Sequence, residues 1–231
     1  MAAMDPKLAK SLKIEDEANM INFDKVEPKP VLAAPGIANP APLGLLCFGM
    51  TTVMLMFINA KWVEPATLNA MMMYACFYGG FGQMVAGVFE MVKGNTFAAT
   101  AFFSYGAFWM AWYVAQFVVK TAAVAGTAVP AFSGAKTFPI GETLIMVLWG
   151  VFTFLFWIPT LRKNGCLCTV FGTLWVTFLL LAGGQWSAAC GQAAGYIGFV
   201  CGCSAIYTAF AEIYQENLGI MLPGLRPIRF I

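Results

Sequence analysis

The sequence contains no histidine among its 231 residues, and only 10% of its residues are charged. Without imidazole the chain lacks the commonest metal ligand and general base of proteins, and histidine cannot ligate a haem. We therefore expect a protein that is not an enzyme, has no cofactor and binds no metal. The net charge of +2 is small and dispersed, with no basic run interleaved with aromatic residues, so we expect no nucleic-acid partner.

Lysine and arginine are also missing from the interior of the long apolar segments, and acidic residues stand only at the ends of these segments. This absence excludes a retinal Schiff-base lysine, a voltage-sensor stripe and a buried cation that would hold an anionic substrate. Glu90 and Glu212, at two of the segment ends, have two interpretations. Each is a solvated helix end, which is the commoner case, or part of a proton relay.

A disulfide framework is not expected either, because the seven cysteines are odd in number and most lie in or beside apolar segments. The pairs Cys166-x-Cys168 and Cys201-x-Cys203 resemble metal motifs. However, residues two apart on a helix point in nearly opposite directions. The spacing therefore indicates packing rather than metal binding.

What the sequence has in abundance is apolar residues, which make up 60% of the chain at a mean hydropathy of +0.75. They fall into blocks long enough to cross a hydrocarbon layer of ~30 Å, which takes about 20 helical residues. We predict an all-α, polytopic membrane protein with six transmembrane helices. The predicted spans are 43–60, 67–91, 98–119, 143–161, 166–184 and 193–211.

The chain divides into three predicted parts, of which residues 39–217 form the six-helix transmembrane domain. Residues 1–38 hold nearly half of the charged residues and end in a proline-containing stretch, which is typical of a largely disordered tail. Residues 218–231 form a second, C-terminal tail. We place both tails in the cytoplasm, most simply at the plasma membrane, with an organelle membrane as the alternative.

The distribution of lysine and arginine near the span ends supports this orientation, because cytoplasmic loops carry the excess of positive charge. With both termini inside, the cytoplasmic side holds seven such residues: Lys25, Lys29, Lys93, Arg162, Lys163, Arg226 and Arg229. The outer side holds three, namely Lys61, Lys120 and Lys136.

Small residues spaced four apart predict close helix packing in the second and sixth spans. The pairs are Gly82 with Ala86, Gly191 with Gly195, and Gly198 with Gly202.

Neutral polar side chains are the remaining candidates at membrane depth. Three sets recur every four residues: Thr169, Thr173 and Thr177; Thr100 and Ser104; Ser204 and Thr208. Either these hydroxyls bond their own backbone carbonyls or a neighbouring helix, or they line a pathway as donors for a small polar solute. Gln83 is the strongest single polar residue, because its amide cannot be left unpaired in lipid.

The segment NPAPLGL at 39–45 directly precedes the first span. Its two prolines remove backbone donors and fix φ, so we expect an extended, rigid turn rather than a helix. We expect the Asn39 side chain to bond the freed backbone groups.

Four segments carry a resemblance to a known family: NPAPLGL followed by CFGMTT, FYGGFGQMVAG at 77–87, GNTFAATAFFSYGAFW at 94–109, and GFVCGCSAIY at 198–207. With six spans of matching spacing, the chain resembles the acetate uptake transporter family over nearly all of 39–217. The resemblance implies transport of acetate or a similar small carboxylate by a homohexamer of six-helix protomers, and it leaves the acceptance of succinate open.

The resemblance also implies a hydrophobic constriction at Phe48, Tyr105 and Leu174, with Ala205 as a small pore-facing position that influences the size of the acid. The acidic tail, Glu142 and the cysteine-rich spans depart from the short bacterial pattern. The full set of candidate pathway residues is Asn39, Phe48, Thr52, Gln83, Thr100, Ser104, Tyr105, Thr173, Leu174, Thr177 and Ala205.

The function predicted from these observations is a transporter or channel-like permease for acetate and related short carboxylates, coupled to protons. A bare carboxylate in a low-dielectric constriction carries a desolvation cost of several kcal/mol, and no cation at membrane depth offsets it. We therefore expect the acid to cross in its neutral form or with a co-moving proton. Two alternatives stay open: an acetate-binding membrane sensor without transport, and a pore for a small neutral or nitrogenous solute such as urea or ammonia.

Overall fold

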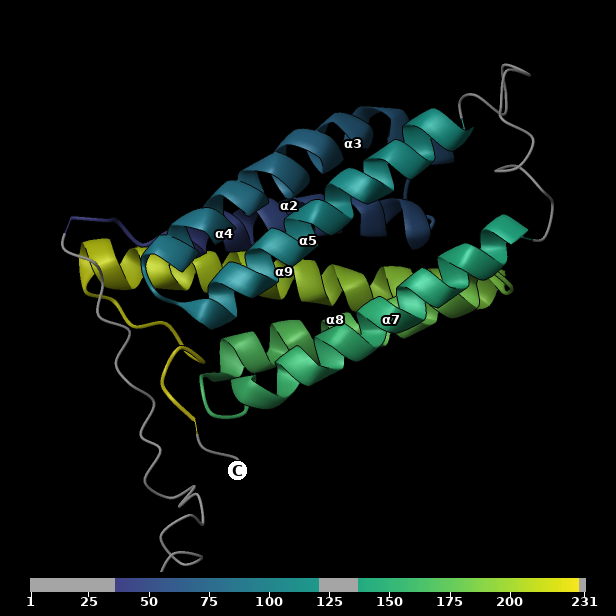
Figure 1. Cartoon of the computed structure of the whole chain (residues 1–231). Coiled ribbons are helices and arrows are strands. Elements are labelled where there is room, and N and C mark those ends of the chain that lie inside the picture. The colour runs from purple at the N-terminus through teal and green to yellow at the C-terminus, as the bar shows by residue number, and fades with distance from the viewer. Residues whose placement is uncertain (1–35, 121–136, 229–231) are drawn as a thin grey trace, which may run out of the picture. The chain divides into compact units, whose positions relative to one another are not determined.

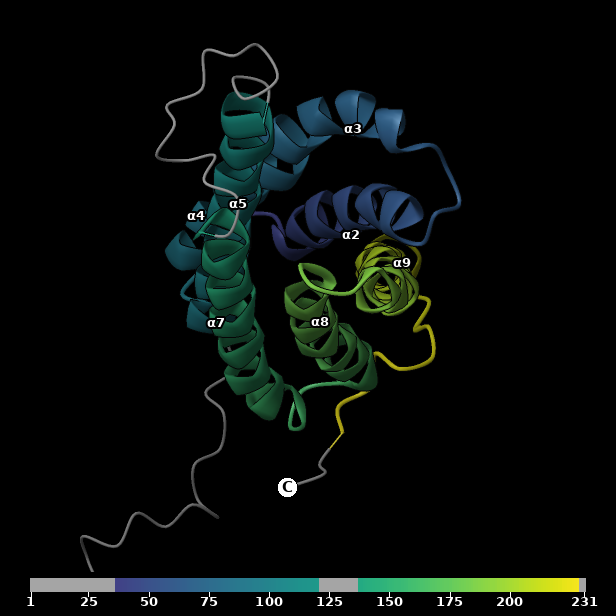
Figure 2. The same ribbon diagram turned by 90° about the vertical axis from the view of Figure 1, so that its right-hand side faces the viewer.

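The computed structural model describes residues 36–120 and 137–228, and the regular elements within these residues are all helical. The predicted tail at 1–38, apart from its last three residues, lies outside them, as does most of the loop after the third predicted span. Each predicted span falls in a helical stretch that lies beside others in Figures 1 and 2. The stretches are α2 (Ala41–Asn59); α3 (Leu68–Tyr74), η3 (Ala75–Gly82) and α4 (Gln83–Val92), preceded by the short η2 (Pro65–Thr67); α5 (Thr96–Val114) and η4 (Ala115–Lys120); α7 (Thr137–Thr160); α8 (Gly165–Gly184); and α9 (Ala188–Leu218).

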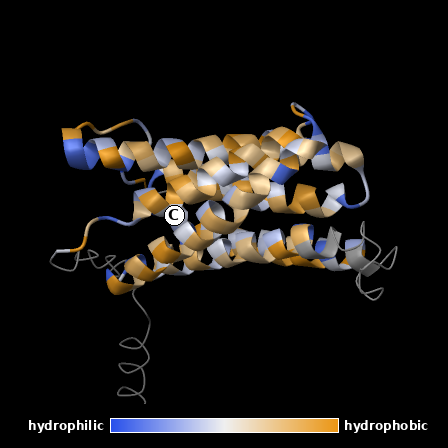
Figure 3. Ribbon diagram, turned by 90° about the horizontal axis from the view of Figure 1, so that it is seen from above, coloured by the Kyte–Doolittle hydropathy of each residue, from blue (hydrophilic) through white to orange (hydrophobic). Residues whose placement is uncertain are grey.

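Within the described residues, four helices are long and apolar enough to cross a membrane by length and composition, namely α2, α7 from Pro139 onward, α8 and α9. The other two stretches each contain a π-helical segment, η3 and η4. Apolar residues dominate along the helices in Figure 3, and polar ones gather toward the helix ends. Large apolar side chains also face outward, with Met73, Phe77 and Met91 each more than 60% exposed. A solvent of lipid explains an apolar exterior of this kind.

The helix ends follow from local sequence. The side chains of Asn95 and Asn164 accept hydrogen bonds from the backbone of Ala98 and Leu167, which caps α5 and α8. Helix α9 ends at Gly219, whose φ of 69° is the left-handed conformation that glycine adopts without a steric penalty. This cap lies beyond the predicted end of the sixth span, so Glu212 and Glu216 belong to the helix itself.

The prediction of an extended turn over 39–45 is wrong for residues 41–45, because α2 begins at Ala41. Pro40 is the N-cap and Pro42 lies in the first turn. Backbone N–H groups there have no partner within the helix, so proline removes nothing that the helix needs. The expected role of Asn39 is confirmed, because its Oδ1 accepts a hydrogen bond from the Ala41 nitrogen at 3.3 Å.

Helix α9 packs closely on both α2 and α8, while α7 packs on α8 and α4 packs on α5. Glycines make the contact between α2 and α9 close. A Cβ at Gly49 would lie 2.8 Å from the Gly202 oxygen, and one at Gly202 would lie 2.7 Å from the Val53 side chain. The predicted close packing of the sixth span is confirmed at Gly202.

The described part of the C-terminal tail folds back on the helices. Gly224 accepts a hydrogen bond from the Cys166 nitrogen at 3.1 Å, and the Ile228 nitrogen donates to the Lys163 oxygen at 3.0 Å. The Tyr207 hydroxyl donates to the Pro223 oxygen at 2.9 Å. These bonds attach the segment to α8 and α9.

Candidate functional site

A cavity of about 250 Å³ lies among α2, α5, α7 and α8. The polar lining residues near the ends of these helices are Asn59, Gln116, Glu142 and Gln185, and we call this polar end the mouth of the cavity. Its inner part is lined by side chains from the middle of the helices, among them Phe48, Thr52, Tyr105, Phe108, Leu174, Thr177 and Phe178. One water takes about 30 Å³ of liquid, so the cavity has room for several waters or one small carboxylate.

The three residues expected at the constriction come together in this cavity, although they lie on three different helices. Phe48, Tyr105 and Leu174 all line it, and each is less than 10% exposed. The Phe48 and Tyr105 rings are 5.8 Å apart between centroids. Around Tyr105 lie further rings from α7 and α8, including Trp149, Phe152 and Phe178. The inner cavity is therefore apolar except for a few hydroxyl groups.

The hydroxyl stripes on α8 and α9 bond the backbone of their own helices, as the first of the two interpretations expected. On α8, Thr169 donates to the Gly165 oxygen, Thr173 to the Thr169 oxygen and Thr177 to the Thr173 oxygen, at 2.7–2.9 Å. On α9, Ser204 and Thr208 donate to the carbonyl four residues earlier. Each of these hydroxyls already donates its hydrogen to a carbonyl, so it can only accept a hydrogen bond from a solute.

Thr52, Tyr105 and Thr177 are the candidate residues that bring hydroxyls to the cavity lining. Six candidate residues lie away from the lining: Asn39, Gln83, Thr100, Ser104, Thr173 and Ala205. Thr100 is exposed, and Ser104 and Thr173 are half-buried on their helices. Ala205 is fully buried in the same apolar cluster as Phe48, Tyr105 and Leu174.

Gln83 is buried at the start of α4, immediately after the π-helical segment η3. Its Oε1, like the Thr51 and Thr52 hydroxyls on α2, has no hydrogen-bond partner among the described residues. Buried polar atoms without a protein partner are rare and are commonly satisfied by water.

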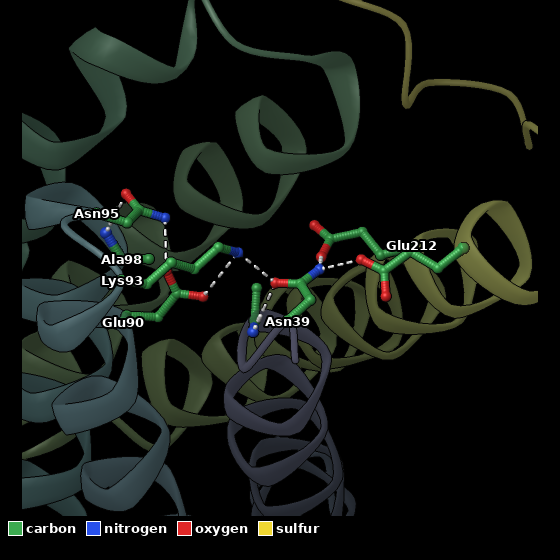
Figure 4. A network of polar contacts seen from close by, with 8 residues as sticks. Asn39, Glu90, Lys93, Asn95, Ala98 and Glu212 are labelled. Carbon is green, nitrogen blue, oxygen red and sulfur yellow. Dashed lines mark hydrogen bonds and ion pairs between the residues drawn. The ribbon is translucent and has the colours of Figure 1, made fainter. Parts of the chain in front are cut away.

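Asn39 lies at the opposite end of α2 from the cavity mouth, in a polar network that joins four helical segments (Figure 4). Its amide nitrogen donates to Glu216 at 2.6 Å and to Glu212 at 3.2 Å. Its oxygen accepts from Lys93 Nζ at 2.8 Å. One asparagine thereby connects two carboxylates on α9 with the lysine that follows α4.

Glu90 extends this network into the protein. Its side chain is fully buried, accepts from Asn95 Nδ2 at 2.7 Å and lies 3.9 Å from Lys93 Nζ. The favoured interpretation of Glu90 as a solvated helix end is therefore wrong. Sequence position could not show this, because the loop through Asn95 covers the carboxylate.

Lys163, between α7 and α8, lies at the same end, with its Nζ 4.6 Å above the centre of the Phe97 ring. Burial lowers the pKa of its ammonium group, and the nearby Glu90 carboxylate opposes that shift. Lys93 and Lys163 are thus held by partners within the protein.

Two features of the site were not predicted. Thr153 on α7 is fully buried and its hydroxyl lies 2.9 Å from the Tyr105 hydroxyl. Gln116 and Gln185 contribute to the polar mouth. No periodic pattern singles out these residues, because their roles depend on which helices become neighbours. Glu142, which also lines the mouth, was marked only as a departure from the family pattern.

Comparison with known proteins places the chain among membrane transporters. The sequence profile of the GPR1/FUN34/yaaH family matches residues 25–226. The succinate-acetate/proton symporter SatP of Escherichia coli is 40% identical over 185 residues, which cover 79% of this chain and 92% of that protein. Acetate permease A of Emericella nidulans is 35% identical over 192 residues, covering 78% of this chain and 63% of the permease. The solved structure of the bacterial acetate channel SatP matches with a TM-score of 0.72 and 38% identity, covering 82% of this chain and 99% of the channel.

Proposed function

The chain belongs to the GPR1/FUN34/yaaH family, and from that premise we propose that it moves acetate across a membrane together with protons. It is an integral membrane protein and an acetate transporter or channel. The observation that carries the mechanism is the cavity with a polar mouth and an apolar inner end at Phe48, Tyr105 and Leu174. A cavity of this form admits a small solute and requires it to lose its hydration water before it passes the apolar end.

The absence of cations from the cavity lining supports proton coupling. Among the described residues, each lysine and arginine lies in a loop or near a helix end, and none lines the cavity. A carboxylate at the constriction would therefore carry its desolvation cost without a cation to offset it. Protonation removes that cost, so the acid passes as the neutral molecule or with a proton beside it.

We further propose that six spans cross the membrane, with α3–η3–α4 and α5–η4 as the two that contain π-helical segments. Helices with π-helical or other irregular turns are tolerated at membrane depth where neighbouring helices cover the freed backbone groups. Six protomers form a hexamer, each with its own pathway. The exposed apolar side chains on η3 and α4 support a surface covered by lipid or by a neighbouring protomer.

Reconstitution into liposomes tests the function. The purified chain should admit labelled acetate faster than liposomes of the same lipid without protein, and unlabelled acetate should compete. Saturable acetate binding without influx would replace the transporter with a sensor. Influx of urea or methylammonium without influx of acetate would replace it with a pore for nitrogenous solutes.

Both termini are expected on the cytoplasmic side of the plasma membrane, as the asymmetry of lysine and arginine indicates. Cysteines introduced near positions 25 and 229 should escape an impermeant thiol reagent in intact cells and react after permeabilisation. Lys61→Cys, exposed in the loop after α2, should react from outside and serves as the control. Labelling of both termini from outside would reverse the orientation, and labelling of one alone would mean an odd number of spans.

Leu174 is expected to limit the size of the acid that passes. The Leu174→Ala variant should raise the influx of lactate or succinate relative to acetate by about tenfold, the range that a change of a few methylenes produces in an apolar pocket. The ratio of two substrates is the measurement, because it does not depend on how much folded protein is present. Leu179→Ala, on the same helix but 41% exposed, is the matched control. An unchanged ratio in Leu174→Ala would remove Leu174 from the pathway.

A further inference from the structure

The hydrogen-bond partners of Tyr105 determine which way its hydroxyl proton points. Its oxygen lies 2.9 Å from Thr153 Oγ1, and Thr153 Oγ1 lies 2.7 Å from the Trp149 carbonyl oxygen on the same helix. A carbonyl oxygen can only accept, and a threonine hydroxyl has one hydrogen. The Thr153 hydrogen therefore goes to Trp149, and Tyr105 must be the donor in its bond with Thr153.

This arrangement leaves the Tyr105 oxygen with lone pairs alone to offer the cavity. Thr153 is fully buried and Tyr105 is 3% exposed, so the bond between them is shielded from bulk water. Thr177, on the opposite helix, is in the same condition, since its hydrogen is donated to the Thr173 oxygen at 2.8 Å. Two of the hydroxyls at the inner end of the cavity are thus acceptors.

Thr52 is the complementary group. It lies one helical turn beyond Phe48, lines the same cavity and is 3% exposed. Its hydroxyl has no hydrogen-bond partner among the described residues, so its hydrogen is not committed to a protein acceptor. The cavity lining therefore includes one hydroxyl whose hydrogen is uncommitted, on Thr52, and two that can only accept, on Tyr105 and Thr177.

We propose that Thr153, by fixing the Tyr105 proton, makes the constriction select the protonated form of the acid over its anion. A neutral carboxylic acid has one donor, its O–H, and one principal acceptor, its C=O. The O–H donates to Tyr105 or Thr177, and the C=O accepts from Thr52. A carboxylate anion, which only accepts, would meet the lone pairs of Tyr105 and Thr177 with one donor in compensation. Thr153 is a positioning residue here, and its role rests on the proposed function.

The selectivity does not require a protein group to titrate, because the proton belongs to the substrate. The side chains packed around Tyr105 are mainly aromatic and come from α2, α5, α7 and α8. The titratable groups that face this region are Cys201 on α9, whose thiol donates to the Val170 oxygen, and Glu142 at the cavity mouth. Neither lies between Tyr105 and Thr153.

The test is the Thr153→Val variant of the full chain in proteoliposomes with a clamped membrane potential. Valine keeps the volume but cannot accept a hydrogen bond, so the Tyr105 hydroxyl becomes free to donate into the cavity. Labelled acetate influx in the wild type should follow the concentration of undissociated acid and ignore the potential. In Thr153→Val, influx at about pH 7 should become potential-dependent and rise about three- to tenfold, the factor that one hydrogen bond in a membrane interior provides.

Controls separate this effect from damage to the fold. Thr160→Val removes another buried hydroxyl of α7 that bonds only the backbone, and it should behave as the wild type. Thr153→Ser keeps both hydrogen bonds and should restore the electroneutral influx. Acetamide is uncharged and always carries N–H donors, so its influx through the wild type should not change with pH and reports an intact pathway.

Three results would overturn the assignment. The first is a Thr153→Val protein that conducts acetamide normally yet keeps the pH profile and electroneutrality of the wild type. The second applies if Thr153→Val does not fold, and it uses Tyr105→Phe instead. This variant removes the acceptor and should lower acetate influx at about pH 5 by about threefold without adding a current. Unchanged influx in Tyr105→Phe would count against the proposal. The third is a wild type with no protein-dependent acetate influx, which would overturn the proposed function itself.

Discussion

Acetate influx through the reconstituted protein is expected to fall about tenfold for each pH unit above the pKa of the acid, at fixed total acetate. The concentration of neutral acid falls by this factor, and the proposed mechanism makes the neutral acid the form that crosses. Under the proposal we expect exclusion of the anion for two reasons: no described cation lines the cavity, and the hydroxyls of Tyr105 and Thr177 present lone pairs. Between about pH 5 and about pH 7 the influx should therefore change by about two orders of magnitude.

Neutral acetic acid also crosses bare lipid, so the measurement needs a background with the same proteoliposomes and a closed pathway. Leu174→Trp supplies it, because the larger ring fills the inner cavity while the rest of the protein is unchanged. The protein-dependent influx is the difference between wild type and this variant at each pH. In cells, a protonophore should abolish accumulation. Influx that ignores pH and follows membrane potential would establish an anion channel and contradict proton coupling.

The positions of the helices could be predicted where an apolar run ends at a loop. The predicted spans 43–60 and 166–184 agree with α2 (Ala41–Asn59) and α8 (Gly165–Gly184) within two residues. The sixth prediction, 193–211, is much shorter than α9 (Ala188–Leu218). Hydropathy reports the thickness of the apolar layer, whereas the helix continues through charged residues until Gly219 ends it.

Part of the candidate site could be predicted from the sequence, and the rest could not for a physical reason. Phe48, Tyr105 and Leu174 were found through resemblance to a family, and helix spacing alone could not have brought three helices together. The hydrogen bond from Tyr105 to Thr153 could not be predicted from the sequence, because it depends on the packing of α5 against α7. The π-helical segment η3 was also missed, since a sequence rich in glycine fits several helical geometries.

The glycines of α9 show that residue spacing alone does not identify which positions pack closely. Spacing by four predicted close packing equally at Gly191, Gly195, Gly198 and Gly202. In the structure a Cβ at Gly191 would meet only the Cα of Gly184 at 3.7 Å, which is ordinary van der Waals contact. A Cβ at Gly195 would collide with the backbone nitrogen of Ala60 and lie 2.7 Å from its Cα. The sequence marks the face of the helix, and the partner helix decides which glycine is needed.

Gly195→Ala should therefore destabilise the protein strongly, while Gly191→Ala should not. The colliding atoms at Gly195 are backbone atoms of α2 and its C-cap, which cannot rotate away as a side chain would. Relief requires α2 to move from α9, and overpacking of this kind costs about 1–3 kcal/mol and occasionally more. Because α2 carries Phe48 and Thr52, the shift should also reduce acetate influx per folded molecule.

At Gly191 the added methyl group meets no obstacle, and alanine favours a helix over glycine by about 1 kcal/mol. Thermal unfolding in detergent should thus show a lower midpoint for Gly195→Ala and an equal or higher one for Gly191→Ala. Equal midpoints in the two variants would mean that α2 and α9 do not approach as closely as the glycine contacts require.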